Sequence, residues 1–193
     1  MTSLNRVLVI GGCGFIGSHI VDSLLSAGHR VRVLDMRGEA YRAPLAGVEY
    51  LQGSFCDADV LRAALTGVDA VVHTASTTVP AAANLNPIAD IDSNLIGTVG
   101  LLQLMRERGI RRMVFLSSGG TVYGIPQIDP VPEDHPQAPI SSYGIVKLAI
   151  ERYLHMERHL HGLDYVALRA SNPYGPRQGH GGLQGIIGTY LWK

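Results

Sequence analysis

A glycine-rich turn near the start of the chain constrains its fold more than any other feature. Residues 6–10 form a β-rich apolar run, and beyond Gly14 apolar residues recur at helical spacing. Gly11, Gly14 and Gly17 stand between the two in the pattern G-x-x-G-x-x-G. Glycines so spaced permit a tight turn, close approach of the backbone to a pyrophosphate, and close packing of helix on strand. The pattern predicts a dinucleotide-binding strand–turn–helix unit.

The same turn begins an expected cofactor site. The pyrophosphate would lie on the helix N-terminus, beside Phe15 and Ile16. Asp35 ends the second apolar run, 18 residues after the last glycine of the turn, where a carboxylate accepts from ribose hydroxyls and repels a 2′-phosphate. Arg32 and Arg37 are cations that could reach a 2′-phosphate, but neither replaces the acid. The sequence therefore predicts NAD rather than NADP.

Apolar runs alternate with helical segments along most of the chain. We expect strands at 6–10, 31–34, 48–51, 70–73, 113–116 and 165–168, and further helices at about 58–65, 88–108 and 142–161. This order suits right-handed crossovers and a parallel sheet covered on both faces. The predicted fold class is α/β, a doubly wound parallel sheet (Rossmann), over residues 1–171. The proline-rich segment 125–140 is expected to be a surface loop.

Composition excludes several classes of partner. Sixteen Lys plus Arg balance sixteen Asp plus Glu among 193 residues, so no basic field favours nucleic acid or an anionic membrane. The apolar run 7–16 is short and broken by glycines, which fits neither a signal peptide nor a membrane span. We therefore expect no nucleic acid and no membrane as partner, and a cytoplasmic location.

The cysteines and histidines do not form a recognisable metal set. Cys13 and Cys56 lack metal-like spacing, so both are expected to be free thiols, with Cys13 an inert filler in the glycine turn. His155 and His159 are four apart on one expected helix, but no carboxylate or cysteine completes a site, which favours a solvated helix face. His73 ends a buried strand and is expected to be structural.

Tyr143 and Lys147 are the strongest catalytic candidates. They stand four apart in the expected helix 142–161, which puts the phenol and the ammonium on one helix face. The pKa of tyrosine is ordinarily near 10, and a nearby cation favours phenolate. The pair alone is common on helix surfaces, but here it accompanies a cofactor turn and a serine-rich segment, 117–124, after an apolar strand. Together these features predict a tyrosine base.

Over residues 4 to about 188 the chain resembles the extended short-chain dehydrogenase/reductase family, specifically its nucleotide-sugar epimerases and dehydratases. The resemblance is carried by Gly11-x-x-Gly14-x-x-Gly17, Asp57, His73-Thr74-Ala75, Asn94 with Gly97-Thr98, Ser117-Ser118 with Val122-Tyr123-Gly124, Tyr143-x-x-x-Lys147, and Arg169 with Asn172-Pro173-Tyr174-Gly175-Pro176-Arg177. It implies that Asp57 faces the adenine, that Ala75 and Asn94 line the cofactor groove, and that Asn172 contacts the sugar nucleotide.

The resemblance also implies a chemistry. Tyr143 as phenolate would take a proton from a sugar hydroxyl, commonly at C4, while NAD accepts hydride from the carbon beneath. The resulting 4-keto sugar would take the hydride back on its other face, which inverts the centre and regenerates NAD. Lys147 would hold the nicotinamide ribose and stabilise the phenolate.

One position departs from the family pattern. Many relatives carry a Ser or Thr four residues before the tyrosine of Val-Tyr-Gly, and here that residue is Gly119. Ser118 and Thr121 are the candidate donors to the reacting oxygen, and Thr121 is preferred, because the glycine pair leaves room for substrate. Ser117 is expected to be structural.

These features favour an NAD-dependent nucleotide-sugar 4-epimerase for a UDP- or dTDP-hexose. The alternatives are a 4-ketoreductase, a dehydratase, which would be expected to carry an acidic pair where Gly120 and Thr121 stand, and a redox-sensing module without catalysis. A homodimer is expected through the helix that carries Tyr143 and the long helix before it. Relatives continue by roughly 100 residues or more, so residues 172–193 are interpreted as the start of a largely absent substrate domain, and we expect NAD binding without turnover.

Overall fold

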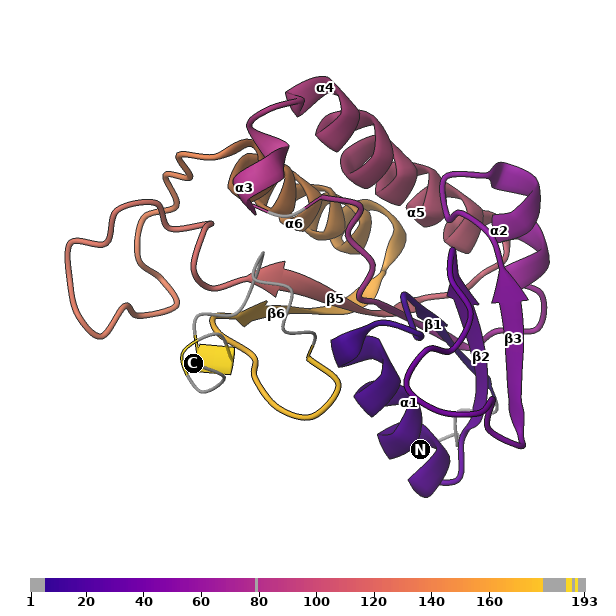
Figure 1. Ribbon diagram of the computed structural model, residues 1–193. Coiled ribbons are helices and arrows are strands. Elements are labelled where there is room, and N and C mark those ends of the chain that lie inside the picture. The colour runs from indigo at the N-terminus through magenta and orange to yellow at the C-terminus, as the bar shows by residue number, and fades with distance from the viewer. Residues whose placement is uncertain (1–5, 79, 179–186, 189, 191–193) are drawn as a thin grey trace.

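The protein is built on one parallel sheet (Figure 1). The computed structural model describes residues 6–78, 80–178, 187–188 and 190, so most of the expected substrate region lies outside the described residues. The strand order is β3-β2-β1-β4-β5-β6, with every neighbouring pair parallel. The strands are β1 (Arg6–Ile10), β2 (Arg30–Asp35), β3 (Val48–Gln52), β4 (Ala70–His73), β5 (Arg112–Ser118) and β6 (Asp164–Ala170). All six expected strands are present, and the predicted doubly wound fold is confirmed.

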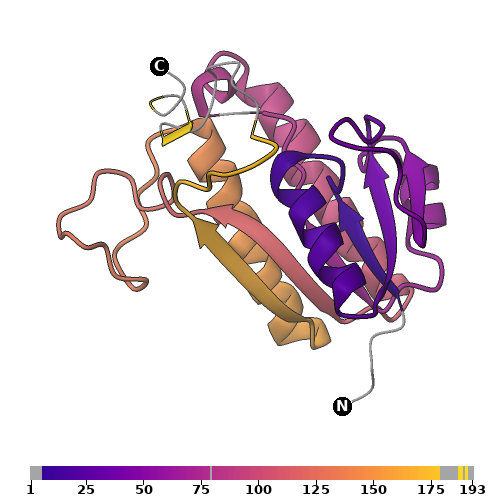
Figure 2. The same ribbon diagram turned by 60° about the horizontal axis from the view of Figure 1, so that its bottom comes forward.

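Helices cover the two faces of the sheet unequally (Figures 1 and 2). The α-helices are α1 (Phe15–Ser26), α2 (Ala58–Ala64), α3 (Pro80–Ala83), α4 (Pro87–Asp90), α5 (Gly97–Glu107) and α6 (Ser142–His161). Helix α1 lies on one face, and α2, α5 and α6 lie on the other. The strand order reverses between β1 and β4, and ligands of such sheets bind beyond the carboxyl ends of the strands at that point.

The helix expected over 88–108 differs in one respect from the prediction. It is split into α4, a π-helical turn η1 (Ile91–Ile96), and α5. A π turn inserts an extra residue into the helical path, and such turns are frequent at functional sites. Here the turn contains Asn94, which is buried and fully engaged in hydrogen bonds. Apolar periodicity does not reveal it, because the polar contacts that stabilise the turn come from distant segments.

Alternate residues of β1 enter two separate cores. Val7 and Val9 pack with α1, whereas Leu8 and Ile10 pack with the helices on the other face. All four are at most 2% exposed. Strands buried on both faces have continuous apolar sequences, which explains why β1 could be predicted from the sequence.

The outer strand β6 is covered on one face only. Tyr165 and Ala167 pack against the core beneath α6, while Val166 and Leu168 point the other way and are 53% and 46% exposed. The segment 125–140 is a loop, as expected, and projects beyond this side of the sheet (Figure 1). No helix in the described part of the chain has the length and hydropathy needed to cross a membrane.

Candidate functional site

The glycine turn after β1 is shaped to admit a ligand close to the backbone. Gly11 has φ +85°, and a Cβ there would lie 2.8 Å from the Ala75 nitrogen. A Cβ on Gly17 would lie 2.1 Å from the Gly11 oxygen, so that position accepts only glycine. Gly14 caps α1 without a side-chain hydrogen bond, and the first turn holds no acid. The N–H groups of Phe15 and Ile16 are thus available to an anion.

Asp35 supports this turn as well as ending β2. One carboxylate oxygen accepts a hydrogen bond from the Cys13 backbone at 3.0 Å, and the other accepts from the Arg37 backbone at 3.0 Å. The turn, the Asp35 carboxylate and residues 74–77 surround a cavity of about 600 Å³. The missing side chains, the open helix N-terminus and the acid together fit a dinucleotide with free ribose hydroxyls.

Arg32, one of the two cations weighed against NAD, is committed elsewhere. It is 5% exposed, donates to the carbonyls of Ala64 and Thr66 at 2.6 and 2.8 Å, and pairs with Glu49 at 2.9 Å. Arg32 therefore closes the end of α2 and does not face the cavity. Arg37 is exposed beside Asp35.

The three further cofactor residues implied by the family resemblance lie in different settings. Ala75 lines the cavity, and its backbone donates to Ile10 at 3.1 Å. Asp57 is exposed and caps α2 by accepting from the two backbone N–H groups at positions 59 and 60. Asn94 is buried and accepts from the Thr77 backbone at 2.9 Å, which fixes the cavity wall. Contact of Asp57 with adenine stays a prediction.

Tyr143 and Lys147 lie together on the first turns of α6. Ser141 caps this helix by accepting from the Gly144 backbone at 3.2 Å. Lys147 is 4% exposed. Its Nζ donates to the Leu116 carbonyl at 2.8 Å and lies 5.5 Å from the centroid of the Tyr143 ring. The helix thus brings the predicted pair to the carboxyl end of β5.

The titration of this pair differs from the sequence-based expectation. Burial, with a smaller effect of Asp90, raises the pKa of Tyr143 above its ordinary value. Burial lowers the pKa of Lys147 to about 8, although the charges of Asp90 and Glu151 oppose that shift. The pKa of Tyr143 is therefore shifted away from phenolate, because burial removes the water that would solvate the charged form.

The β5–α6 junction explains the glycine at position 119. A Cβ there would lie 2.5 Å from the Arg169 carbonyl of β6, so a serine or threonine does not fit without moving the strand. Of the two proposed substitutes, Thr121 has a buried hydroxyl with no hydrogen-bond partner among the described residues. Ser118 ends β5, and its hydroxyl is likewise unengaged within the described chain but is not sealed off.

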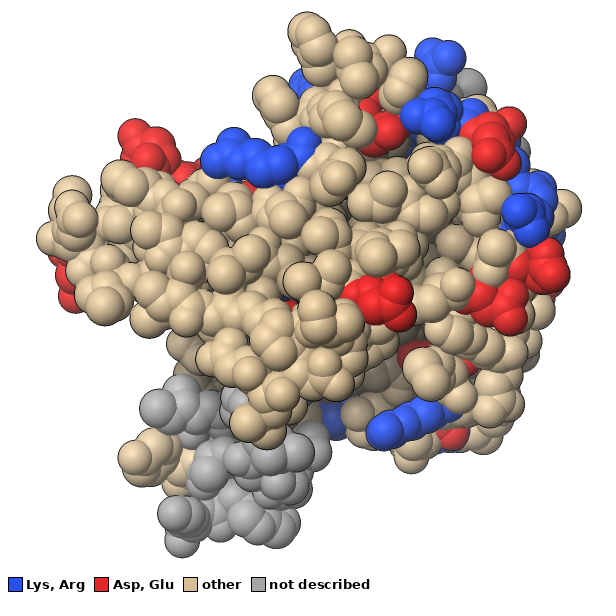
Figure 3. All heavy atoms as spheres, turned by 90° about the horizontal axis from the view of Figure 1, so that it is seen from above, with Lys and Arg blue, Asp and Glu red and all other residues tan. Residues whose placement is uncertain are grey.

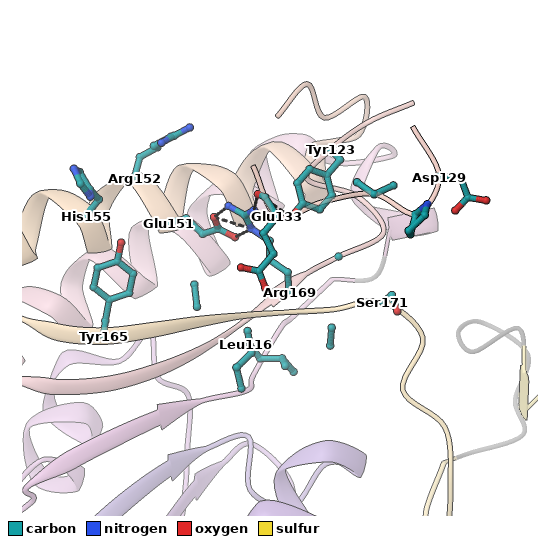
Figure 4. Close-up of a pocket in the computed structure, with 16 residues that line it drawn as sticks. Leu116, Tyr123, Asp129, Glu133, Glu151, Arg152, His155, Tyr165, Arg169 and Ser171 are labelled. Atoms are coloured by element: carbon teal, nitrogen blue, oxygen red, sulfur yellow. Dashed lines mark hydrogen bonds and ion pairs between the residues drawn. The ribbon is translucent and has the colours of Figure 1, made fainter. Parts of the chain in front are cut away.

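A second cavity, of about 1120 Å³, lies between α6, β6 and the loop 125–140 (Figure 4). In its wall Arg169 points between Glu151 of α6 and Tyr123, bonding to them at 2.7 Å each. Ser117 donates to the same Glu151, which confirms its structural role. The hydrogen bonds to Arg169 raise its pKa and keep it charged. Nothing in the sequence pattern singled out Glu151, because its partners come from separate elements.

The remaining candidates have structural settings. His73 is buried, its Nε2 lies 3.1 Å from the Thr98 hydroxyl, and burial lowers its pKa to about 3, so it is a neutral core residue as expected. Burial raises the pKa of Cys13 to about 11, which makes it a poor nucleophile. His155 and His159 are exposed on α6, and Asn172 is exposed after β6.

The fold and the glycine turn define a dinucleotide-binding protein of the doubly wound class. A family model described as the NAD dependent epimerase/dehydratase family matches residues 7–192. The chain belongs to this family.

Named relatives agree with that membership. A putative UDP-glucose 4-epimerase from Methanocaldococcus jannaschii is 38% identical over 97% of this chain and 62% of its own length. A Thermus thermophilus UDP-glucose 4-epimerase crystallised with NAD gives a TM-score of 0.87 at 36% identity, covering 97% of this chain and 60% of its own. A Thermotoga maritima UDP-glucose 4-epimerase with UDP-glucose gives 0.89 at 33% identity, covering 96% and 61%. The chain thus spans about 60% of the length of these relatives.

Proposed function

We propose that this protein is an NAD-dependent nucleotide-sugar 4-epimerase that acts through a transient 4-keto sugar. One observation carries the proposal: a continuous set of hydrogen bonds runs from the cofactor cavity to the residue before Tyr143. Thr77 of the cavity wall bonds to Asn94, Asn94 bonds to Asp90, and Asp90 bonds to Ser142. This continuity supports the proposal that the dinucleotide cavity and the candidate base act as one site.

The chain's own residues account for cofactor binding. Gly11, Gly14, Gly17 and the N-terminus of α1 would hold the pyrophosphate, and Asp35 would hold the adenosine ribose. Ala75 and Asn94 shape the wall along the rest of the groove, with Asp57 expected near the adenine. When bound, NAD supplies a reversible acceptor of hydride at the sugar carbon.

Four side chains are proposed to act at the sugar or beside it. Tyr143 removes and returns the proton of the C4 hydroxyl, and Lys147 stabilises the phenolate and the nicotinamide ribose. Ser118 is the better donor to the C4 oxygen, since the Thr121 hydroxyl is buried. Asn172 would contact the sugar nucleotide from its exposed position after β6.

The substrate is proposed to be a UDP-hexose. The named relatives are UDP-glucose 4-epimerases, and the Thermotoga structure contains UDP-glucose. A dTDP-hexose remains the alternative substrate, and competition binding of UDP and dTDP would distinguish the two.

A homodimer through α6 is also proposed. Helix α6 exposes Tyr153, Met156 and Leu160 at helical spacing, and Ile88 and Ile91 are exposed where α4 meets η1. Figure 3 looks onto this side of the molecule, where uncharged surface predominates between separate groups of charged side chains. Analytical ultracentrifugation of the chain, with Met156→Lys as a disrupting variant, tests this part.

The deciding experiment measures cofactor binding and turnover separately. Calorimetry on the chain should show NAD binding more tightly than NADP, because Asp35 opposes a 2′-phosphate. Interconversion of UDP-glucose and UDP-galactose, measured on a longer form of the protein that carries the substrate region, should need only catalytic NAD. Tighter NADP binding, or consumption of a reduced cofactor in each turnover, would refute the epimerase and favour a 4-ketoreductase.

A further inference from the structure

Asp90 is a buried acid that no motif identified. It ends α4, has 0% exposure, and accepts three hydrogen bonds. The hydroxyl of Thr78 and the amide of Asn94 donate to one carboxylate oxygen at 2.6 and 2.8 Å. The hydroxyl of Ser142 donates to the other at 2.6 Å.

The donors come from three separate segments: the stretch after β4, the π turn and the start of α6. No Lys, Arg or His forms an ion pair with Asp90 in the part of the chain that the structure describes. A buried carboxylate is costly unless hydrogen bonds compensate its lost hydration. Here three short bonds supply that compensation, so the acid fixes the three segments relative to one another.

Ser142 is the point at which this arrangement reaches the candidate base. It is the first residue of α6, where backbone N–H groups have no partner within the helix and the chain tends to fray. Its hydroxyl is held by Asp90, and its backbone N–H donates to the Asn84 side chain at 2.8 Å. Tyr143 follows directly, so its backbone is held by these two contacts.

We propose that Asp90 is a positioning residue for Tyr143, which it holds through Ser142 and ties, by way of Asn94, to Thr77 in the wall of the cofactor cavity. The inference rests on the proposed function, in which Tyr143 is the base. Asp90 itself lies behind Ser142 and touches no reacting atom. Its negative charge, with that of Glu151, also favours the ammonium form of the neighbouring Lys147.

Fluorine NMR of the chain labelled with 3-fluorotyrosine tests the proposal without requiring turnover. The Tyr143 resonance is assigned by its loss in Tyr143→Phe. Ser142→Ala and Asp90→Asn should shift and broaden it, because the first turn of α6 loses its anchor. Ser142→Thr, which keeps a hydroxyl, should restore the wild-type line. Ser117→Ala is the matched control, since it removes a hydroxyl–carboxylate bond to the same helix at Glu151, eight residues after Tyr143.

Turnover gives a second readout. In a longer form of the protein that carries the substrate region, Ser142→Ala should lower kcat by roughly tenfold or more with little change in KM, as expected for a misaligned base. A Tyr143 resonance that is unchanged in Ser142→Ala, or equally changed in Ser117→Ala, overturns the proposal; the Ser142 variants decide the matter even if Asp90→Asn fails to fold. A failure of the proposed function would be seen separately, because full turnover in Tyr143→Phe would show that Tyr143 is not the base.

Discussion

Burial acts in opposite directions on the two residues of the candidate base. It raises the pKa of Tyr143 and lowers that of Lys147, so the phenol keeps its proton and the ammonium is easily lost above neutrality. A protonated phenol cannot accept the proton of a sugar hydroxyl, so Tyr143 acts as a base only in its phenolate form, which the Lys147 ammonium would have to stabilise against the effect of burial.

In a longer form of the protein that carries the substrate region, Tyr143→Phe should remove most turnover and leave cofactor binding intact. The ring keeps its place above Lys147, but the proton-transfer group is gone, which typically costs 10²- to 10⁴-fold. Steady-state kinetics and NAD calorimetry on the same preparation check this. Turnover within a factor of two of wild type would remove Tyr143 from its role.

Ser118→Ala should slow hydride transfer more than Thr121→Val does. Ser118 has an available hydroxyl at the end of β5, whereas the Thr121 hydroxyl is enclosed without a partner. Loss of one donor to a developing oxyanion typically costs about 10²-fold. Single-turnover rates of NAD reduction on adding UDP-glucose measure the difference, and the reverse order would return the role to Thr121.

At the scale of elements, the close pairing of β5 with β6 leaves no space for a hydroxyl side chain at position 119. The two strands pair along their whole length up to Ser118 and Ala170. Beyond that register the Arg169 carbonyl occupies the space that a side chain at position 119 would need.

Gly119→Ser should therefore destabilise the fold by about 1–3 kcal/mol, as overpacking against backbone does, and should not supply a donor in a useful position. Gly120→Ser is the matched control, because a Cβ there meets nothing within 4 Å. Its effect should stay within about 0.5 kcal/mol. Urea unfolding gives the free energy of unfolding of both variants. Equal values would show that β6 can shift to admit a side chain at position 119 at little cost in stability.

The sequence predicted the six strands because each contains a run of mostly apolar residues, and the glycine turn after β1 marked the start of α1. It also placed Tyr143 and Lys147 together, since both lie on one regular helix. It did not predict the π turn, Asp90 or Glu151. These depend on hydrogen bonds between segments far apart in the chain, such as Asp90 with Ser142 and Glu151 with Arg169. Single-sequence periodicity carries no record of such contacts.

At the scale of the whole molecule, the buried ammonium links the site to global stability. The folded state releases the Lys147 proton near pH 8, whereas an unfolded lysine releases it near 10.5. Between these values the unfolded state binds more protons, so the free energy of unfolding rises as pH increases. The full rise attributable to this residue is at most about 3 kcal/mol.

Lys147→Met should lack this rise. Chemical denaturation of wild type and variant from pH 7 to 10.5 should give unfolding free energies whose difference grows in favour of wild type above about pH 8. Groups remote from Lys147 titrate equally in both proteins, and His73, whose pKa Lys147 lowers, stays neutral over this range, so the difference reports on Lys147. Parallel curves would mean that its ammonium is better solvated than the structure indicates.

Asp35 has a consequence for redesigning cofactor choice. Its carboxylate is the support of the Cys13 backbone within the pyrophosphate turn, as well as the acid expected to select NAD. Replacing it with a neutral residue to admit NADP would loosen the turn that both cofactors share, while Arg32 is already occupied by α2 and Glu49. A switch to NADP in this scaffold must therefore rebuild the turn's support from another donor–acceptor pair, with Arg37 as the nearest free cation for the phosphate.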